Sequence, residues 1–160
     1  MKQRVLFICL GNICRSCTAE EIFRTLVARA GYSQHFDIDS AGIIDYHEGE
    51  LPDERMRRIA ARHGYQLTHR SRPFTAADFD RFDWIVAMDE KNRICLQLLA
   101  ETESQLRKIV MMADYLTRHE SSYIPDPYYG EERDFEWVVE LLEDACSGFL
   151  SETEPLKITE

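Results

Sequence analysis

The chain has 160 residues, of which 44% are hydrophobic, 7 are Gly and 5 are Pro. This composition is typical of one globular domain rather than of a disordered or fibrous protein. The formal net charge of -10 argues against general affinity for nucleic acid or an anionic membrane, because no basic stripe offsets it. The apolar run from Val5 to Leu10 is too short for a signal peptide or a membrane span. We therefore expect a cytoplasmic protein that binds neither nucleic acid nor membrane.

Strand and helix patterns alternate along the chain. Short apolar or alternating runs predict strands over 5–8, 36–39, 84–88 and 108–111. Helical spacing of apolar residues predicts helices over 19–30, from Pro52 to Gly64, through 94–99 and over 135–149. Thr18 and Glu21 are expected to form a capping box at the start of the first helix.

This alternation predicts a single α/β domain over residues 1–152, with a central parallel sheet of four strands flanked by helices. Residues 153–160 are expected to form a frayed tail. In such doubly wound sheets, ligands bind beyond the carboxyl ends of the strands, where the strand order reverses. The loop after the first strand is such a place.

This first loop has the residues of an anion site. Cys9 and Arg15 stand with five residues between them, Gly11 lies in that interval, and a helix is expected to follow. Backbone N–H groups of such a turn, together with the helix N-terminus, would bind phosphate and stabilise a thiolate at Cys9. Arg15 could then hold two phosphate oxygens at once. From these residues alone, an inert buried Cys9 and a solvated Arg15 are an equally acceptable interpretation.

The wider sequence favours the functional interpretation. The string from Cys9 to Ser16, Cys-Leu-Gly-Asn-Ile-Cys-Arg-Ser, is similar to the signature loop of the low-molecular-weight protein tyrosine phosphatases. Further segments resemble motifs of that family in the family's order: Asp39-Ser40-Ala41-Gly42, Tyr46-His47-Glu48-Gly49, His69-Arg70-Ser71-Arg72, Ala87-Met88-Asp89 and Asp126-Pro127-Tyr128-Tyr129-Gly130. The resemblance therefore covers nearly the whole chain.

The resemblance implies a flavodoxin-like fold of the phosphotyrosine phosphatase I type and hydrolysis of phosphotyrosine proteins and aryl phosphates through a phosphocysteine, without metal or other cofactor. It implies that Cys9 is the nucleophile, that Arg15 clamps phosphate, that Ser16 donates to the sulfur, and that Asp126 is the general acid and base. Residues expected to bind the substrate, with phosphate or another oxyanion in the loop, are Leu10, Gly11, Asn12, Ile13, Cys14, Tyr46, Tyr128 and Tyr129. Ser40 and His69 are expected to support the loop together with Asn12.

The role of Asp126 also follows from the chemistry. A phenolate is a poor leaving group unless it is protonated, because the pKa of phenol is about 10, so a carboxylic acid beside it would speed its departure. The same carboxylate could then activate water. Asp-Pro by itself is more typical of a turn, and only its context favours catalysis. Tyr46, Tyr128 and Tyr129 could form an aromatic wall that admits a phenyl ring.

The five cysteines are an odd number, and three of them lie in or beside the loop, so a structural disulfide framework is not expected. Cys14 and Cys17 have the spacing of a redox or zinc pair, but the histidines are scattered, and we assign neither role. The resemblance implies instead that Cys14 can form a protective disulfide with Cys9. Cys17 departs from the family, which usually has Pro there, so the first helical turn is less pre-organised.

Three alternatives share parts of this pattern. Arsenate reductases of the same superfamily need two further cysteines, of which Cys95 supplies at most one. Phosphoarginine phosphatases carry Thr where this loop has Ile13 and lack the Tyr pair after Asp-Pro. A non-catalytic phosphate-binding module would lack Cys9 or Asp126. Of the remaining charged residues, Asp89 is interpreted as structural, and the cluster Arg55, Arg57 and Arg58 as a solvated helix face.

Overall fold

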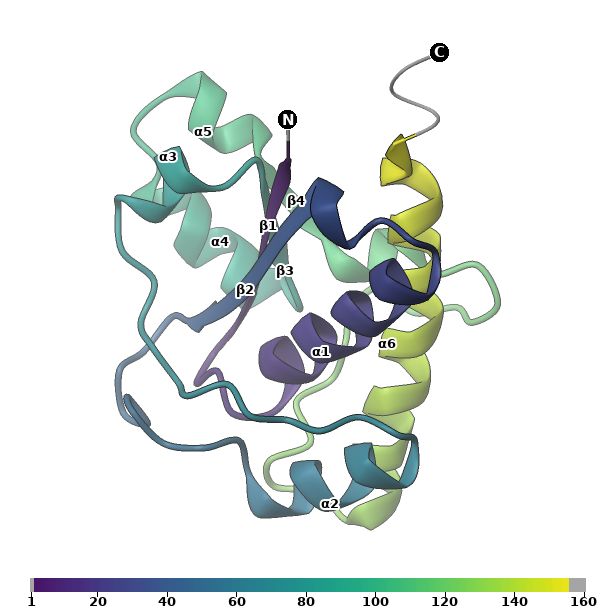
Figure 1. The fold of residues 1–160 in the computed structure, drawn as a ribbon. Coiled ribbons are helices and arrows are strands. Elements are labelled where there is room, and N and C mark those ends of the chain that lie inside the picture. The colour runs from purple at the N-terminus through teal and green to yellow at the C-terminus, as the bar shows by residue number, and fades with distance from the viewer. Residues whose placement is uncertain (1, 156–160) are drawn as a thin grey trace.

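Four parallel strands form the centre of the computed structural model, which describes residues 2–155 (Figure 1). The strands are β1 (Gln3–Cys9), β2 (Phe36–Gly42), β3 (Trp84–Ala87) and β4 (Ile109–Met111), in the order β2-β1-β3-β4. All three pairings between neighbouring strands are parallel. The chain moves outward in one direction from β1 to β2 and in the other direction from β3 to β4. The strand order therefore reverses beside β1, so the loop after β1 lies at the topological switch, as the sequence predicted.

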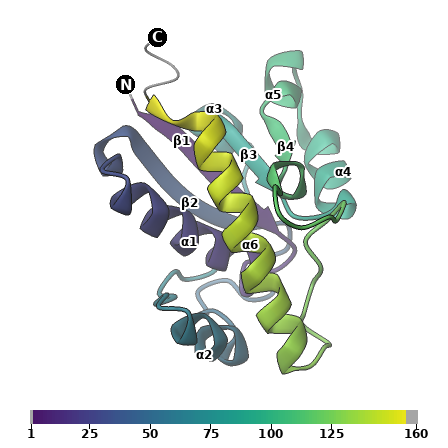
Figure 2. The same ribbon diagram turned by 90° about the vertical axis from the view of Figure 1, so that its right-hand side faces the viewer.

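Helices cover both faces of the sheet (Figures 1 and 2). The helices are α1 (Arg15–Arg29), α2 (Glu54–Arg62), α3 (Asp78–Arg81), α4 (Glu90–Leu99), α5 (Glu103–Arg107) and α6 (Glu132–Thr153), with 3-10 turns at Ser33–His35 and Met112–Tyr115. Alternate residues of β1 point to opposite faces. Val5 and Phe7 pack with α1, α2 and α6, whereas Leu6 and Ile8 pack with α3 and α4. The predicted single α/β domain is confirmed.

The start of α1 differs from the prediction. The helix begins at Arg15 with Cys14 as its N-cap, and no side chain caps it. Thr18 therefore lies inside the first turn, where its hydroxyl donates to the Cys14 carbonyl oxygen at 2.6 Å. The predicted capping box of Thr18 and Glu21 is wrong, because the loop after β1 already sets the helical path at Arg15. The predicted start of α2 is confirmed, since the Asp53 side chain accepts from the backbone N–H groups of its first turn.

The C-terminal helix α6 is longer than expected. It continues to Thr153, whose side chain is fully buried, so the helix extends into the first residue of the predicted frayed tail. Residues 156–160 of that tail lie outside the described residues. None of the helices in the described part of the chain is long and apolar enough to span a membrane.

Candidate active site

The loop between β1 and α1 lies against the end of β2. Cys9, the last residue of β1, is 2% exposed. Asn12 has a φ of 58°, a left-handed conformation that Asn tolerates better than most residues and that turns the chain sharply. A Cβ at Gly42 would come within 3.0 Å of the Leu10 carbonyl oxygen and 3.1 Å of the Asn12 nitrogen. Gly42 therefore lets the loop lie directly on the neighbouring strand.

The Asn12 side chain fixes the shape of the loop through hydrogen bonds. This side chain is fully buried and makes four hydrogen bonds to three other parts of the chain. The amide Nδ2 donates to Ser16 Oγ at 2.7 Å and to Ser40 Oγ at 3.0 Å. The amide Oδ1 accepts from His69 Nε2 at 3.0 Å and from the Arg72 backbone N–H at 3.1 Å. The loop shape is thus fixed by hydrogen bonds that are shielded from water.

The direction of these bonds orients Ser16 toward the sulfur. Ser16 Oγ lies 3.1 Å from Cys9 Sγ, and its longer alternative acceptor, the Ala41 carbonyl oxygen, lies at 3.5 Å. Because Ser16 Oγ accepts a hydrogen bond from the Asn12 amide, its own hydroxyl hydrogen is available to donate to Cys9 Sγ. A hydrogen bond from a hydroxyl stabilises a thiolate more than a neutral thiol.

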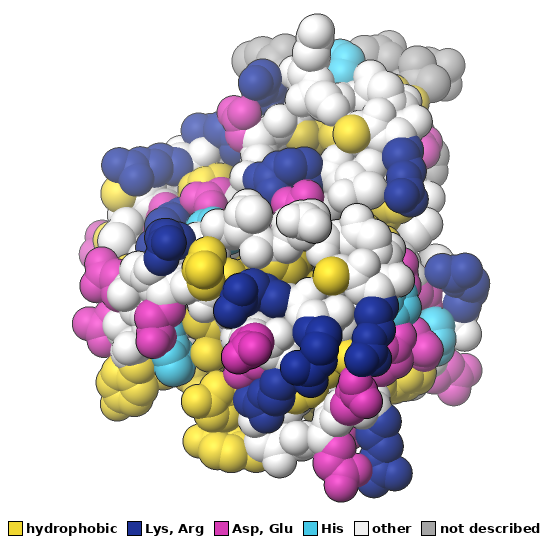
Figure 3. Space-filling view, turned by 60° about the horizontal axis from the view of Figure 1, so that its bottom comes forward, with side chains coloured by type: hydrophobic (Ala, Val, Ile, Leu, Met, Phe, Trp, Pro, Cys, Tyr) yellow, Lys and Arg dark blue, Asp and Glu magenta, His cyan; other side chains and the backbone are white. Residues whose placement is uncertain are grey.

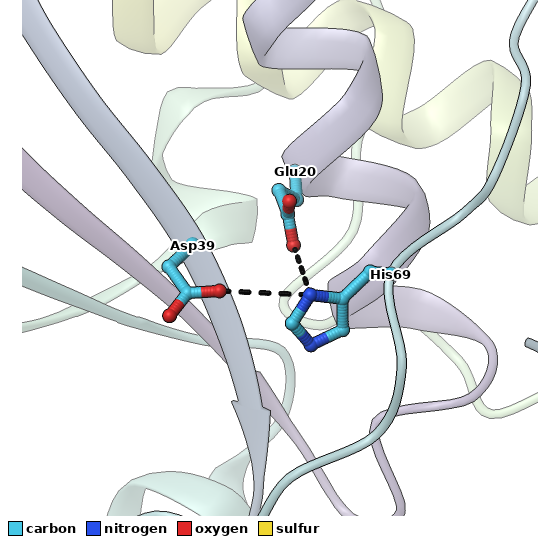
Figure 4. A group of neighbouring side chains, drawn as sticks. All are labelled: Glu20, Asp39 and His69. Atoms are coloured by element: carbon cyan, nitrogen blue, oxygen red, sulfur yellow. Dashed lines mark ion pairs between the residues drawn. The ribbon is translucent and has the colours of Figure 1, made fainter. Parts of the chain in front are cut away.

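A second group of side chains supports His69 (Figure 4). His69 Nδ1 lies 3.3 Å from Glu20 Oε1 of α1 and 3.6 Å from Asp39 Oδ1 of β2. Among the described residues, these three have ligand-type atoms that all lie within 4.8 Å of one another, so they are the residues that could hold a cation. Arg24 and Arg72 already pair with the two carboxylates, at 2.9 and 3.0 Å. The group is therefore satisfied by the chain's own ion pairs, and we interpret it as support for the loop.

Arg15 joins the loop to two neighbouring segments. Its guanidinium is 2% exposed, and Nη1 donates to Asp89 Oδ2 at 2.7 Å and to the Ile124 carbonyl oxygen at 2.9 Å. Although burial lowers it, the pKa of Arg15 lies above its ordinary value because of the charge of Cys9 and the contacts with Asp89 and Asp126. Asp89 also caps α4 by accepting from the Asn92 backbone N–H at 2.8 Å, in agreement with the structural role predicted for it.

One donor of Arg15 is unused within the described structure. The buried Nε has no hydrogen-bond partner there, while Nη2 lies 3.7 Å from Asp126 Oδ2. A buried donor without a partner is unfavourable by about 1–3 kcal/mol. Nε and Nη2 of one guanidinium have the spacing that matches two oxygens of a phosphate. Arg15 is therefore available to an oxyanion in the loop.

A cleft of about 340 Å³ opens above the loop. It is lined by Cys9, Leu10, Gly11, Ile13, Cys14, Arg15, Ile44, Tyr46, His47, Asp126, Tyr128 and Tyr129. Figure 3 views the end of the molecule that carries α2, where Lys and Arg side chains lie next to hydrophobic ones. Tyr46 and Tyr129 are 82% and 95% exposed, which leaves them free to contact a substrate.

The segment with Asp126 is held in place beside this cleft. Asp126 Oδ1 accepts from the Tyr128 backbone N–H at 3.1 Å, and Arg55 Nη2 donates to the Tyr128 carbonyl oxygen at 3.0 Å. The Arg55 guanidinium also lies over the Tyr128 ring, at 5.5 Å from its centroid. From the sequence, Arg55 is interpreted as part of a solvated helix face. In the structure it pairs with Asp53 and binds the segment that contains Asp126 and Tyr128.

The structure brings most of the predicted site residues together. Cys9, Arg15, Asp126 and the three Tyr residues share the cleft, and Ser16 contacts the sulfur. Asn12, Ser40 and His69 lie beneath the loop and do not line the cleft. Sequence reasoning missed Ile44 and His47 as lining residues. His47 follows Tyr46 in a segment already singled out, so that segment was the available signal.

The cysteines differ in access. None of the five forms a disulfide, and Cys14 lines the cleft whereas Cys17 does not. Burial, followed by the negative charge of Cys9, raises the pKa of both Cys14 and Cys17. Burial also raises the pKa of Cys146, on α6. A raised pKa makes these thiols weaker nucleophiles at neutral pH than an ordinary cysteine.

The chain matches one family throughout. The model of the family described as "Low molecular weight phosphotyrosine protein phosphatase" matches residues 4–157. The human protein of that name is 40% identical over 150 residues, which are 91% of this chain and 92% of that protein. A low molecular weight protein-tyrosine-phosphatase of Streptomyces coelicolor is 40% identical over 153 residues, 94% of this chain and 93% of that one.

Solved structures agree with these relatives. A protein tyrosine phosphatase from Entamoeba histolytica, crystallised with Hepes in its active site, superposes with a TM-score of 0.94 at 40% identity, over 98% of this chain and 99% of that one. A Drosophila arginine phosphatase gives a TM-score of 0.88 at 34% identity, over 96% of this chain and 98% of that one. The chain therefore belongs to the low molecular weight phosphotyrosine protein phosphatase family.

Proposed function

We propose that this protein hydrolyses phosphotyrosine in proteins, and aryl phosphates, through a phosphocysteine at Cys9. One observation carries the proposal: a single cleft holds Cys9 and Arg15 on its floor, Asp126 at its side and tyrosines at its rim. The match to a phosphotyrosine protein phosphatase family and the relatives of that name support the proposal. Phosphotyrosine proteins as substrates and the cytoplasmic localisation expected from the sequence stay predictions.

In the first step, the phosphate of the substrate binds in the loop. Backbone N–H groups at the start of α1, the unpartnered Nε of Arg15 and its Nη2 bind the phosphate oxygens. The Cys9 thiolate, stabilised by the Ser16 hydroxyl at 3.1 Å, then attacks phosphorus. The S–P bond forms as the P–O bond to the phenol breaks, and protonated Asp126 gives its proton to the departing phenolate.

In the second step, the Asp126 carboxylate takes a proton from water. The water oxygen bonds to phosphorus, the S–P bond breaks, and Cys9 leaves as a thiolate while inorganic phosphate is released. Asp126 is 39% exposed and can therefore meet both the phenol oxygen and water. The two half-reactions return Cys9 and Asp126 to their starting protonation states.

The nucleophile is tested by Cys9→Ser, which should abolish turnover and leave the fold intact. A serine hydroxyl is a much weaker acid than a thiol, so the same loop does not ionise it. Loss of an activated nucleophile usually lowers kcat by far more than 10²-fold. Steady-state rates on p-nitrophenyl phosphate measure the loss, and residual activity above about a hundredth of wild type would remove Cys9 from this role.

The choice of substrate is tested with a panel of phosphopeptides. Phosphotyrosine should be turned over best, and phosphoserine should be poor because its shorter side chain does not span the cleft. Phosphoarginine is the second candidate, because a structural neighbour is named an arginine phosphatase. Ile13, which lines the cleft, presents an apolar side chain where the phosphoarginine phosphatases carry Thr, and this favours the aryl group. Faster turnover of phosphoarginine would reverse the assignment.

A further inference from the structure

Asp144 is a buried carboxylate that the proposed mechanism does not use. It lies on α6, outside the cleft, and its side chain is fully buried. Facing it is the segment 112–131, which connects β4 to α6 and carries Asp126. Figure 2 shows this segment running beside α6. We refer to residues 112–131 as the acid segment.

Five hydrogen-bond donors of the acid segment converge on this one carboxylate. Asp144 Oδ1 accepts from the Thr117 backbone N–H at 3.0 Å and from Thr117 Oγ1 at 2.9 Å. Asp144 Oδ2 accepts from the backbone N–H groups of Arg118 and His119 at 3.0 and 2.9 Å, and from His119 Nδ1 at 2.9 Å. Both oxygens are therefore fully used, and three successive N–H groups are fixed in direction.

A second contact fixes the same part of the acid segment to the same helix. A Cβ at Gly148 would lie 1.9 Å from the Tyr115 carbonyl oxygen, so the backbone of the segment touches α6 where no side chain intervenes. The Tyr115 ring packs on Phe149 with centroids 4.9 Å apart. Gly148 stands one helical turn after Asp144 and therefore on the same face of α6. Asp144 and Gly148 together hold residues 115–119 against the helix.

From this anchored point the acid segment runs to the cleft. Residues 120–123 include a turn in which Ser121 Oγ donates to the Tyr123 carbonyl oxygen. Ile124 follows, fully buried, with its N–H donating to the Met88 carbonyl oxygen at 2.8 Å and its carbonyl oxygen accepting from Arg15. Asp126 lies two residues after Ile124. The acid segment is thus held near the cleft by Arg15 and Arg55 and against α6 by Asp144.

We propose that Asp144 is a positioning residue for catalysis, which fixes the direction of the acid segment so that Asp126 meets the leaving-group oxygen. The proposal rests on the proposed function, in which Asp126 is the general acid. If Asp144 served only to stabilise the fold, its loss would lower the amount of folded enzyme and would leave the dependence of the rate on the leaving group unchanged. If it positions Asp126, the rate on substrates that need protonation falls most.

The test replaces Asp144 with Asn. Asn keeps the side-chain shape but places one NH₂ group where a carboxylate oxygen now accepts from donors of residues 117–119. Either orientation of the amide leaves two or three donors of the acid segment facing another donor. We expect kcat/KM to fall about tenfold for phenyl phosphate, whose phenol needs a proton, and less than about threefold for p-nitrophenyl phosphate. The inhibition constant of inorganic phosphate should change by less than about twofold, because Arg15 and the loop are untouched.

Two further variants make the result decisive. Thr117→Val removes a single donor and keeps the side-chain shape, so it should show a smaller selective loss in the same direction and serves if Asp144→Asn does not fold. Asp83→Asn is the matched control, because Asp83 also accepts from a backbone N–H, that of Arg4 at 2.9 Å, but precedes β3 at the end of the sheet away from the cleft. It should show no leaving-group selectivity.

The outcomes separate the proposal from the function on which it rests. Asp126→Ala should itself show a loss of roughly 10² to 10⁴ on poor leaving groups and a much smaller loss on acidic phenols. If Asp126→Ala is selective but Thr117→Val and folded Asp144→Asn lower all substrates equally, or none, the positioning role is overturned. If Asp126→Ala shows equal losses across the phenols, the general-acid role fails, and the basis of the proposal fails with it.

Discussion

Replacing Asn12 with Asp tests how the loop stabilises the thiolate. The change keeps the side-chain shape and the acceptor used by His69 and the Arg72 backbone N–H. It replaces the donor that Ser16 Oγ now accepts from, at 2.7 Å, with a carboxylate oxygen. The Ser16 hydroxyl then has a charged acceptor closer than Cys9 Sγ, which lies at 3.1 Å. We expect the hydroxyl to turn away from the sulfur.

The expected loss follows from one hydrogen bond to a charged group, which contributes about 1.5–3 kcal/mol. At 1.36 kcal/mol for each factor of ten, the reactivity of Cys9 at neutral pH falls by roughly 10- to 150-fold. The new carboxylate also repels the thiolate. Asn12→Asp should therefore lose at least as much as Ser16→Ala, which removes the hydroxyl outright.

The assay is the rate of alkylation of Cys9 by iodoacetamide as a function of pH, with kcat/KM on p-nitrophenyl phosphate measured in parallel. In Asn12→Asp and Ser16→Ala, alkylation of Cys9 at neutral pH should be slower than in wild type. Circular dichroism checks that both variants fold. The reasoning about hydrogen-bond direction is refuted if Ser16→Ala shifts the alkylation profile and folded Asn12→Asp does not.

Two other predictions concern oxidation and acid stability. Peroxide should oxidise Cys9 first, and the oxidised Cys9 should then form a disulfide with Cys14, which also lines the cleft. Wild type and Cys17→Ser should therefore recover activity with a dithiol, whereas Cys14→Ser should not. A peptide map that shows only a disulfide between Cys9 and Cys17 would contradict this prediction. Burial opposes ionisation of Asp144, but hydrogen bonds from His119 and from the backbone of residues 117–118 hold its pKa below the usual value. The ionised carboxylate therefore adds fully to the free energy of unfolding above about pH 4, and this stabilisation is lost as the pH falls further. Urea denaturation of wild type should therefore show a steeper loss of unfolding free energy below about pH 4 than that of Asp144→Asn, and parallel curves would count against the assignment.

The sheet and the loop could be predicted because their signals are local. The apolar run ending at Cys9 identifies a buried strand, and the string after it identifies the anion loop. The first turn of α1 was wrongly placed because its start depends on the loop conformation, in particular on the left-handed Asn12, and not on a capping side chain. Thr18 has the residue type of a cap but lies inside the helix.

Residues that act across long sequence separations escaped prediction for a different reason. Asp144 sits in a helix with many acidic residues, and nothing in its neighbourhood distinguishes it from the exposed ones. Its role becomes visible only when residues 117–119 are placed beside it. Arg55 was likewise interpreted as solvated because its contact with the Tyr128 carbonyl oxygen joins segments that lie far apart in the sequence.

The buried Asn12 makes the floor of the cleft less tolerant of substitution than its rim. Its four hydrogen bonds tie the loop floor to α1, β2 and the segment around His69, so a substitution in any of these partners disturbs the chemistry. At the rim, Tyr46 and Tyr129 are 82% and 95% exposed and Leu10 is 43% exposed, so a substitution at these three positions disturbs few contacts within the protein. New substrate preferences can therefore arise at the rim by single substitutions, while the reaction on the floor is inherited unchanged.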